Sequence, residues 1–197
     1  MGLTSKDIKI YFDMDGVLVD FNGGVEKMCG ITPQPQGIKH RSQTKENEMW
    51  DAIRNVDHFY SKLEPIEDGL TALEWARERY GKENVEILTG VPKLDKEIAF
   101  ATEDKREWIK KYIGDDIVVN TVLRADKVNF AKHNLCILID DHPGNIKAWN
   151  KAGGSGILYK NSLDTEVLID ATINAFLEHG CEDPLIDCLL VDKFDHE

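Results

Sequence analysis

The sequence lacks a cluster of cysteines. Its four cysteines, Cys29, Cys136, Cys181 and Cys188, lie far apart or seven residues apart. They do not have the tight spacing of a zinc site or of a disulfide framework. Cys136 falls inside an apolar run, so we expect it in the core. The pattern therefore predicts neither kind of cysteine site.

Long hydrophobic runs are also missing. No apolar stretch approaches the ~20 residues that a membrane span requires, and residues 1–7 lack the apolar region of a signal peptide. We therefore expect a cytoplasmic protein that does not bind a membrane.

Positive charge is scarce. The chain has 24 Lys and Arg against 36 Asp and Glu, a formal net charge of −12. This balance disfavours a broad electrostatic footprint on polymeric nucleic acid or on an anionic membrane. A small phosphate ester could still bind, because one metal ion and one lysine dominate the local field.

The length and composition are those of an ordinary soluble globular protein. With 197 residues, the chain is long enough for one domain with an inserted piece but short for two independent domains. Its hydrophobic share of 42% and charged share of 30% do not indicate disorder.

Short apolar runs alternate with amphipathic segments along most of the chain. After the apolar run that starts at residue 8, we predict helices at 65–80, 101–112, 144–151 and 163–179, and strands at 85–88, 117–123, 135–139 and 156–159. Strands without polar alternation are typical of a sheet buried on both faces. The sequence therefore predicts an α/β fold, a Rossmann-like, doubly wound parallel sheet with helices on both faces.

One stretch interrupts this alternation. It contains glycines and prolines and becomes amphipathic near Trp50. We interpret residues 20–66 as an insert of short helices and loops. The α/β core then comprises residues 1–19 and 67–180, and residues 181–197 form an acidic C-terminal tail.

Two carboxylates, Asp13 and Asp15, end the first apolar run and precede Gly16. Side chains at this spacing point to the same side of a strand, and open α/β sheets bind ligands at the carboxyl ends of their strands. Two close acids repel each other unless a cation lies between them or one is protonated. The pair suggests a divalent metal, a nucleophile with an acid, or both; a plain Asp-Gly turn is the alternative.

Other polar residues follow later strands or precede them. Thr89 ends the second strand, Asp140 and Asp141 end a later one, and Lys127 and Lys132 precede that later strand. Parallel strands bring such ends to one crevice. Oxygen ligands of this kind suit Mg²⁺, and a hydroxyl and an ammonium beside it would neutralise phosphate oxygens.

Four short segments resemble the signature motifs of the haloacid dehalogenase-like (HAD) phosphohydrolases, in the same order. They are Asp-Met-Asp-Gly-Val-Leu from Asp13, Ile-Leu-Thr-Gly ending at Gly90, a lysine, and Ile-Asp-Asp ending at Asp141. The resemblance covers roughly residues 7–160. It implies that the insert is a helical cap, which covers the site, excludes water and reads the leaving group.

Further segments resemble the 5′(3′)-deoxyribonucleotidases within this superfamily. The similar segments are residues 59–66 with Gly69 and Ala72, residues 105–109, and the pair Asp126 and Lys127. This resemblance implies a phosphoric monoester hydrolase that acts on a small phosphomonoester, a nucleoside monophosphate.

The resemblance also implies a role for each matching residue. Asp13 would be the nucleophile that becomes an aspartyl phosphate. Asp15 would be the general acid to the leaving oxygen and then the base for water. Thr89 would bind the phosphoryl oxygens by a hydrogen bond, and Lys127 would neutralise their charge.

For the metal, the resemblance implies Mg²⁺ held by Asp13, by the backbone carbonyl of Asp15 and by a carboxylate of the Asp140–Asp141 pair. Asp141 is the preferred ligand of that pair, and Asp140 would orient the lysine.

Two departures from the deoxyribonucleotidase pattern are visible. This chain has Thr89-Gly90-Val91 where those enzymes usually have Thr-Ser-Pro, so only the Gly90 amide could replace the serine contact. Three more residues separate Lys127 from the aspartate pair, which makes Lys132 a competitor for the role of phosphate lysine.

Aromatic residues of the insert are candidates for base binding. Phe21, Trp50, Phe59 and Tyr60 could stack on a nucleobase; the alternative is that they form the core of the cap.

The sequence thus predicts a Mg²⁺-dependent phosphomonoesterase with an aspartyl-phosphate intermediate, most similar to a deoxyribonucleotidase. A phosphatase for a sugar phosphate or another small phosphoester is the alternative, and a non-catalytic phosphate-binding regulator is a third interpretation. Monomer and homodimer both stay open.

Overall fold

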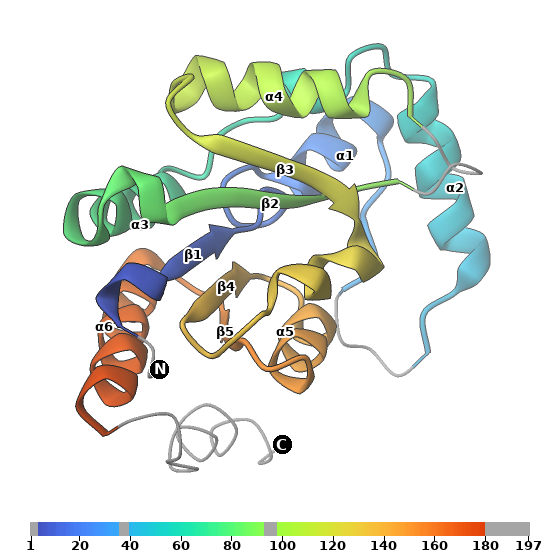
Figure 1. Cartoon of the computed structure of the whole chain (residues 1–197). Helices are drawn as coiled ribbons and strands as arrows, with labels where there is room; N and C mark the ends of the chain where they lie inside the picture. Colours follow the sequence, from blue (N-terminus) through green and yellow to red (C-terminus); the bar gives the residue numbers. More distant parts are fainter. Residues whose placement is uncertain (1–3, 36–39, 93–97, 180–197) are drawn as a thin grey trace.

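A computed structural model of the chain describes residues 4–35, 40–92 and 98–179. Five strands form one parallel sheet in the order β3-β2-β1-β4-β5 (Figure 1). The strands are β1 (Lys9–Phe12), β2 (Val85–Val91), β3 (Val118–Leu123), β4 (Cys136–Asp140) and β5 (Ser155–Leu158). The central position of β1 places the residues that follow it between the ends of β2 and β4.

Six α-helices and four 3-10 helices connect or extend these strands within the described residues. The α-helices are α1 (Phe21–Cys29), α2 (Gln43–Arg54), α3 (Glu67–Tyr80), α4 (Ala101–Tyr112), α5 (Pro143–Lys151) and α6 (Ser162–His179). The 3-10 helices are η1 (Ser5–Asp7), η2 (Tyr60–Lys62), η3 (Lys82–Asn84) and η5 (Arg124–Phe130).

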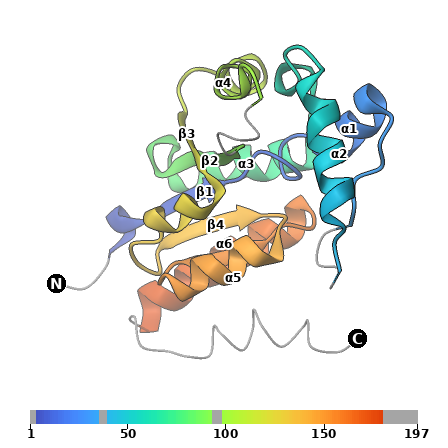
Figure 2. The same cartoon turned by 90° about the vertical axis from the view of Figure 1, so that its right-hand side faces the viewer.

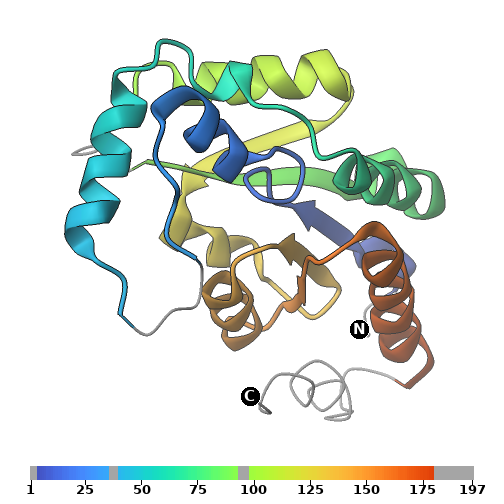
Figure 3. The ribbon, with the colours of Figure 1, turned by 180° about the vertical axis from the view of Figure 1, so that it is seen from behind.

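Successive side chains of a strand point to opposite faces of the sheet. Both faces are buried. In β1, Ile10 and Phe12 join a core with residues of α3 and α6, whereas Tyr11 joins a second core with Trp149 of α5. Figure 3 shows α3 and α6 side by side. The predicted α/β fold with helices on both faces is confirmed.

Element ends differ from the prediction where tertiary pairing decides them. The second strand continues to Val91 because β3 runs beside it, with Val91 paired to Leu123. Helix α5 begins at Pro143, where the ring nitrogen Nδ1 of His142 accepts a hydrogen bond from the Gly144 amide and caps the helix.

The chain leaves the core after β1 and returns to it before α3 along two adjacent segments. The Asp20 amide donates to the Glu64 carbonyl at 2.9 Å, and the Ile66 amide donates to the Leu18 carbonyl at 2.8 Å. Figure 2 shows α1 and α2, both from this excursion, next to each other. That residues 20–66 form a separate cap stays a prediction.

The strands β2 and β3 point toward the side of the molecule on which α2 lies (Figure 1). The insert therefore lies near the carboxyl ends of the strands, where the sequence places the polar residues. The predicted acidic tail, residues 181–197, lies outside the described residues.

Among the described helices, none is long and apolar enough to cross a membrane.

Trp108 joins α4 to the returning end of the insert. Its side chain is buried, and its indole Nε1 donates a hydrogen bond to the Leu63 carbonyl at 2.8 Å. We expect Trp108→Phe to lower the free energy of unfolding by about 2–4 kcal/mol, because it leaves a cavity and a buried carbonyl without its donor. Urea unfolding measures this loss. Trp75→Phe, at a half-buried tryptophan of α3, is the control and should cost less than about 1.5 kcal/mol; equal losses would contradict the prediction.

Candidate active site

A cavity of about 600 Å³ lies at the carboxyl ends of the strands. Its volume is in the range of small-molecule sites. The core lines it with Asp13, Asp15, Gly90, Lys127 and Asp141, among others. The insert lines it with Phe21, Arg41, Glu46, Trp50 and Tyr60, among others. Residues from both parts of the chain thus enclose one space.

Asp13 is fixed by the central strand. Its amide donates to the Ile139 carbonyl of β4 at 2.8 Å, so the sheet holds its backbone, and its own Oδ1 accepts from the Met14 amide at 2.8 Å. Only 6% of Asp13 is exposed. These two hydrogen bonds fix Asp13 where it lines the cavity.

Lys127 bridges two of the carboxylates. Its Nζ lies 2.9 Å from Asp13 Oδ1 and 2.8 Å from Asp140 Oδ2, and only 3% of the residue is exposed. Lys132, in contrast, is exposed to solvent and follows η5. Of the two candidate lysines, the structure brings Lys127 into the site.

Asp13 and Lys127 both have a raised pKa, for different reasons. Burial raises the pKa of Asp13, and the Lys127 ammonium opposes that shift without cancelling it. Burial alone would lower the pKa of Lys127, but the charges of Asp13 and Asp140 outweigh burial and raise it. Lys127 is therefore a cation at neutral pH.

Asp15 is paired with a different lysine. The Nζ of Lys105 donates to Asp15 Oδ2 at 2.7 Å, to Thr89 Oγ1 at 2.8 Å and to the Gly90 carbonyl at 3.0 Å. Lys105 has no exposed surface. Burial raises the pKa of Asp15, and Lys105 is the main group that opposes this shift.

The sequence reasoning missed Lys105 as a site residue, although its segment contributed to the family resemblance. Lys105 shares the buried face of α4 with Trp108 and Ile109, at helical spacings of three and four. A lysine at the positions of a helix face that also carry Trp108 and Ile109 is the sequence signal that could have identified it, because a buried charge requires a partner.

Thr89 lies two residues before the end of β2, is fully buried and is not among the described residues that line the cavity. Its hydroxyl oxygen accepts the hydrogen bond from Lys105. The next residue, Gly90, lines the cavity itself.

Three carboxylates are close enough to share a cation. Asp13, Asp140 and Asp141 offer oxygen atoms that all lie within 4.8 Å of one another. Both oxygens of Asp140 already accept hydrogen bonds, from Lys127, from the His142 amide and from the Asn145 side-chain amide.

Asp141 lies against the turn that follows β1. A Cβ built on Gly16, whose φ is +78°, would lie 2.1 Å from Asp141 Oδ2, so only glycine allows the carboxylate to come this close. The Asp13 and Asp141 carboxylates, beside the turn that carries Asp15, form an oxygen-only donor set that fits Mg²⁺.

Aromatic rings from the insert form one wall of the cavity. Phe21, Trp50 and Tyr60 line it, and the Phe21 ring lies 6.0 Å from Trp50 and 6.3 Å from Tyr60, measured between ring centroids. Phe59 is buried behind Phe21, at 5.7 Å, and is not among the described residues that line the cavity. Phe59 was a candidate for base stacking, but the structure does not place it at the cavity.

A polar network lies at the mouth of the cavity. Glu46 accepts a hydrogen bond from Trp50 Nε1 at 3.0 Å and lies 3.0 Å from the Arg41 guanidinium. Arg124 Nε donates to Asn145 Oδ1 at 2.7 Å, and its Nη2 contacts His142. Burial, followed by these two arginines, lowers the pKa of His142.

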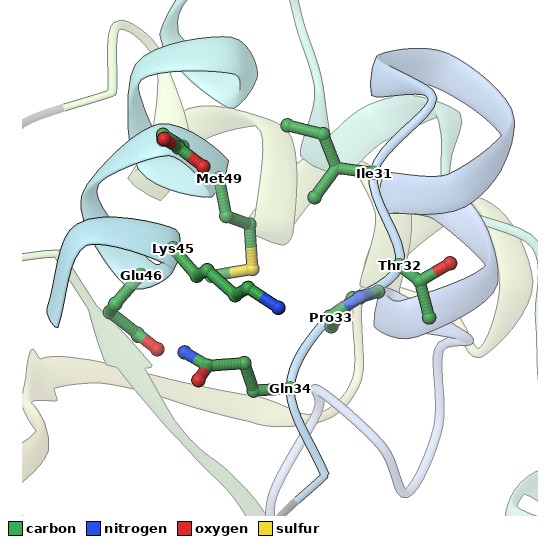
Figure 4. Close-up of a pocket in the computed structure, with 8 residues that line it drawn as sticks. Ile31, Thr32, Pro33, Gln34, Lys45, Glu46 and Met49 are labelled. Atoms are coloured by element: carbon green, nitrogen blue, oxygen red, sulfur yellow. The ribbon is translucent and has the colours of Figure 1, made fainter. Parts of the chain in front are cut away.

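A second, smaller cavity of about 180 Å³ lies beside the first, on the side of the insert (Figure 4). Lys45 and Met49 of α2 line it together with Ile31 and Gln34 of the segment after α1. Since Gln34 and Met49 line both cavities, α2 and this segment together build the outer wall of the site.

No family model matches the chain. It is 26% identical over 160 residues to the mitochondrial 5′(3′)-deoxyribonucleotidase of Homo sapiens, covering 73% of this chain and 66% of that protein. It is 24% identical over 158 residues to the corresponding protein of Mus musculus, covering 71% and 67%. The chain thus spans about two thirds of the length of these relatives.

Among solved structures, the chain is similar to a HAD-superfamily hydrolase from Ehrlichia chaffeensis, with a TM-score of 0.51 and 13% identity over 88% of this chain and 100% of that one. This similarity shows the fold. The resemblance inferred from the motifs is confirmed: the chain has the fold of HAD-superfamily hydrolases and is similar in sequence to 5′(3′)-deoxyribonucleotidases.

Proposed function

We propose that the protein is a Mg²⁺-dependent phosphomonoesterase that hydrolyses nucleoside monophosphates through an aspartyl phosphate on Asp13. The observation that carries this proposal is the unequal setting of the two acids: Asp13 faces Lys127, and Asp15 faces Lys105. Two carboxylates with separate environments can take separate roles.

In the first step, a carboxylate oxygen of Asp13 forms a bond to phosphorus while the bond between phosphorus and the sugar oxygen breaks. Asp15 gives its proton to that oxygen, so the nucleoside leaves as an alcohol. Burial favours the protonated form of Asp15 that this step requires, since it raises the pKa of that side chain.

In the second step, Asp15 accepts a proton from water, and the oxygen of that water bonds to phosphorus. The bond between phosphorus and Asp13 breaks, which releases inorganic phosphate and restores the Asp13 carboxylate, with Asp15 protonated again for the next turnover. Lys127 contacts two carboxylates in the described structure, so one N–H of its ammonium remains for a phosphoryl oxygen. The Gly90 amide is the proposed substitute for the serine of related enzymes.

Asp13, the backbone carbonyl of Asp15 and Asp141 are the proposed Mg²⁺ ligands. When bound, the ion would supply positive charge that offsets the phosphate dianion. Asp140 orients Lys127 instead, because both of its oxygens are already hydrogen-bonded.

A nucleoside suits the aromatic wall of the cavity. Phe21, Trp50 and Tyr60 offer apolar faces at the side of the insert, and stacking of a base on an aromatic side chain contributes ~1–3 kcal/mol. The hydrogen bond that Trp50 Nε1 donates to Glu46 fixes the orientation of the indole ring. Rates of phosphate release from a panel of nucleotides and sugar phosphates would determine the preferred base and the position of the phosphate on the sugar.

Asp13→Asn tests the nucleophile. Without a carboxylate to attack phosphorus, we expect the release of phosphate from dUMP or dTMP to fall by about 10⁴-fold or more. Phosphate release with Mg²⁺ present measures this loss. The exposed Asp126→Asn is the matched control and should keep wild-type activity; activity of Asp13→Asn near the wild-type rate would refute the mechanism.

Lys127→Met and Lys132→Met distinguish the two lysines. The first change removes the ammonium between Asp13 and Asp140, so activity should fall by about 100-fold. The second changes an exposed side chain and should leave activity within about twofold. Steady-state kinetics on dUMP measures both; a larger loss at Lys132 would reverse the assignment.

Binding of Mg²⁺ is testable without turnover. A ligand that binds the native state raises Tm, so adding Mg²⁺ should raise the Tm of the wild-type protein. Asp141→Asn should lose most of this increase because a proposed ligand becomes neutral, whereas Asp126→Asn should keep it. Thermal unfolding with and without Mg²⁺ gives the comparison; an unchanged increase in Asp141→Asn would exclude that residue as a ligand.

A further inference from the structure

We infer that Lys105 is a positioning residue, which holds the Asp15 carboxyl in the orientation that protonates the leaving group. This inference rests on the proposed function and assigns a role to a residue outside the four motifs.

The ammonium of Lys105 has no capacity left for substrate. It carries three N–H donors and no acceptor, and it contacts three oxygens, of Asp15, Thr89 and Gly90. Lys127, in contrast, contacts two carboxylates in the described part of the chain. The two buried lysines are therefore not equivalent: one can reach phosphate, and the other is fully used by the protein.

The bond from Lys105 distinguishes the two oxygens of Asp15. Oδ2 accepts the hydrogen bond at 2.7 Å, whereas Oδ1 is buried and has no hydrogen-bond partner in the described structure. Since Asp15 lines the cavity and its side chain is 27% exposed while Oδ1 is buried, Oδ2, the oxygen held by Lys105, is the one on the side of the leaving group. Rotation of the carboxyl would break the contact with Lys105, so the contact opposes it.

The support for Lys105 is rigid. Helix α4 carries it on the same buried face as Trp108, which is hydrogen-bonded to the Leu63 carbonyl. The ring of Tyr60, from the insert, lies 4.5 Å from the ammonium, a favourable cation–π distance. Packing on both sides fixes the ammonium, as precise positioning requires.

This role predicts a dependence on the leaving group. A nucleoside oxygen is a poor leaving group and needs the proton from Asp15, whereas p-nitrophenolate leaves without one. The parameter to compare is kcat/KM, because it includes only the steps up to departure of the leaving group and excludes hydrolysis of the phosphorylated enzyme.

We expect Lys105→Met to lower kcat/KM for dUMP by about 100-fold, the size of a general-acid contribution, but kcat/KM for p-nitrophenyl phosphate by less than about fivefold. Lys110→Met, an exposed lysine of the same helix, should change neither. Asp15→Asn should show the same selective loss as Lys105→Met. Circular dichroism and thermal unfolding report whether each variant is folded.

Equal losses on both substrates would overturn the inference, because Lys105 would then act through phosphate binding or through the fold; unchanged kinetics would overturn it too. If Lys105→Met does not fold, Lys105→Gln, which removes the ammonium but leaves a polar, shorter side chain in the buried site, is measured against the same expectation. Failure of the proposed function is a separate result, in which the wild-type protein hydrolyses neither substrate.

Discussion

The close approach of two acids, Asp13 and Asp15, inside the end of a parallel sheet is the constraint on which the site depends. Removing an ionised carboxylate from water costs several kcal/mol unless a partner compensates it. The structure supplies two partners from different directions, Lys127 from the segment before β4 and Lys105 from α4. Each acid therefore has its own counter-charge.

The separate partners give the two acids different chemistry. Asp13 lies beside Lys127, and its carboxylate forms with Asp140 and Asp141 a group of oxygens within 4.8 Å of one another. Asp15 lies on the side of Lys105 and the aromatic ring of Tyr60, nearer the insert. In the mechanism that we propose, attack on phosphorus and proton transfer to the leaving oxygen therefore depend on different neighbours. The two lysines provide local positive charge in a chain whose net charge is −12.

Most of the fold could be predicted from the sequence because its signals are local. Apolar periodicity predicted the helix over 101–112 with the bounds of α4, and the buried strands followed from runs without polar alternation. The end of the second strand differed from the prediction because pairing with β3 extends β2 to Val91. Neither segment alone encodes this pairing.

The site was predictable to the extent that its residues follow strands. The positions of Asp13, Asp15 and Asp141 follow from the sheet, but the contact of Lys105 with Asp15 joins residues 90 positions apart and has no local pattern. The choice between Lys127 and Lys132 depends on η5, which turns one lysine inward and leaves the other in solvent.

Trapping of the covalent intermediate would decide whether Asp13 is the nucleophile. The protein is mixed with dUMP and Mg²⁺, quenched in acid within milliseconds and digested for mass spectrometry. The structure predicts one phosphoryl group on the peptide that contains Asp13 and no phosphoryl group in Asp13→Asn. Turnover by an enzyme that never carries phosphate on this peptide, or phosphate on another residue, would contradict it.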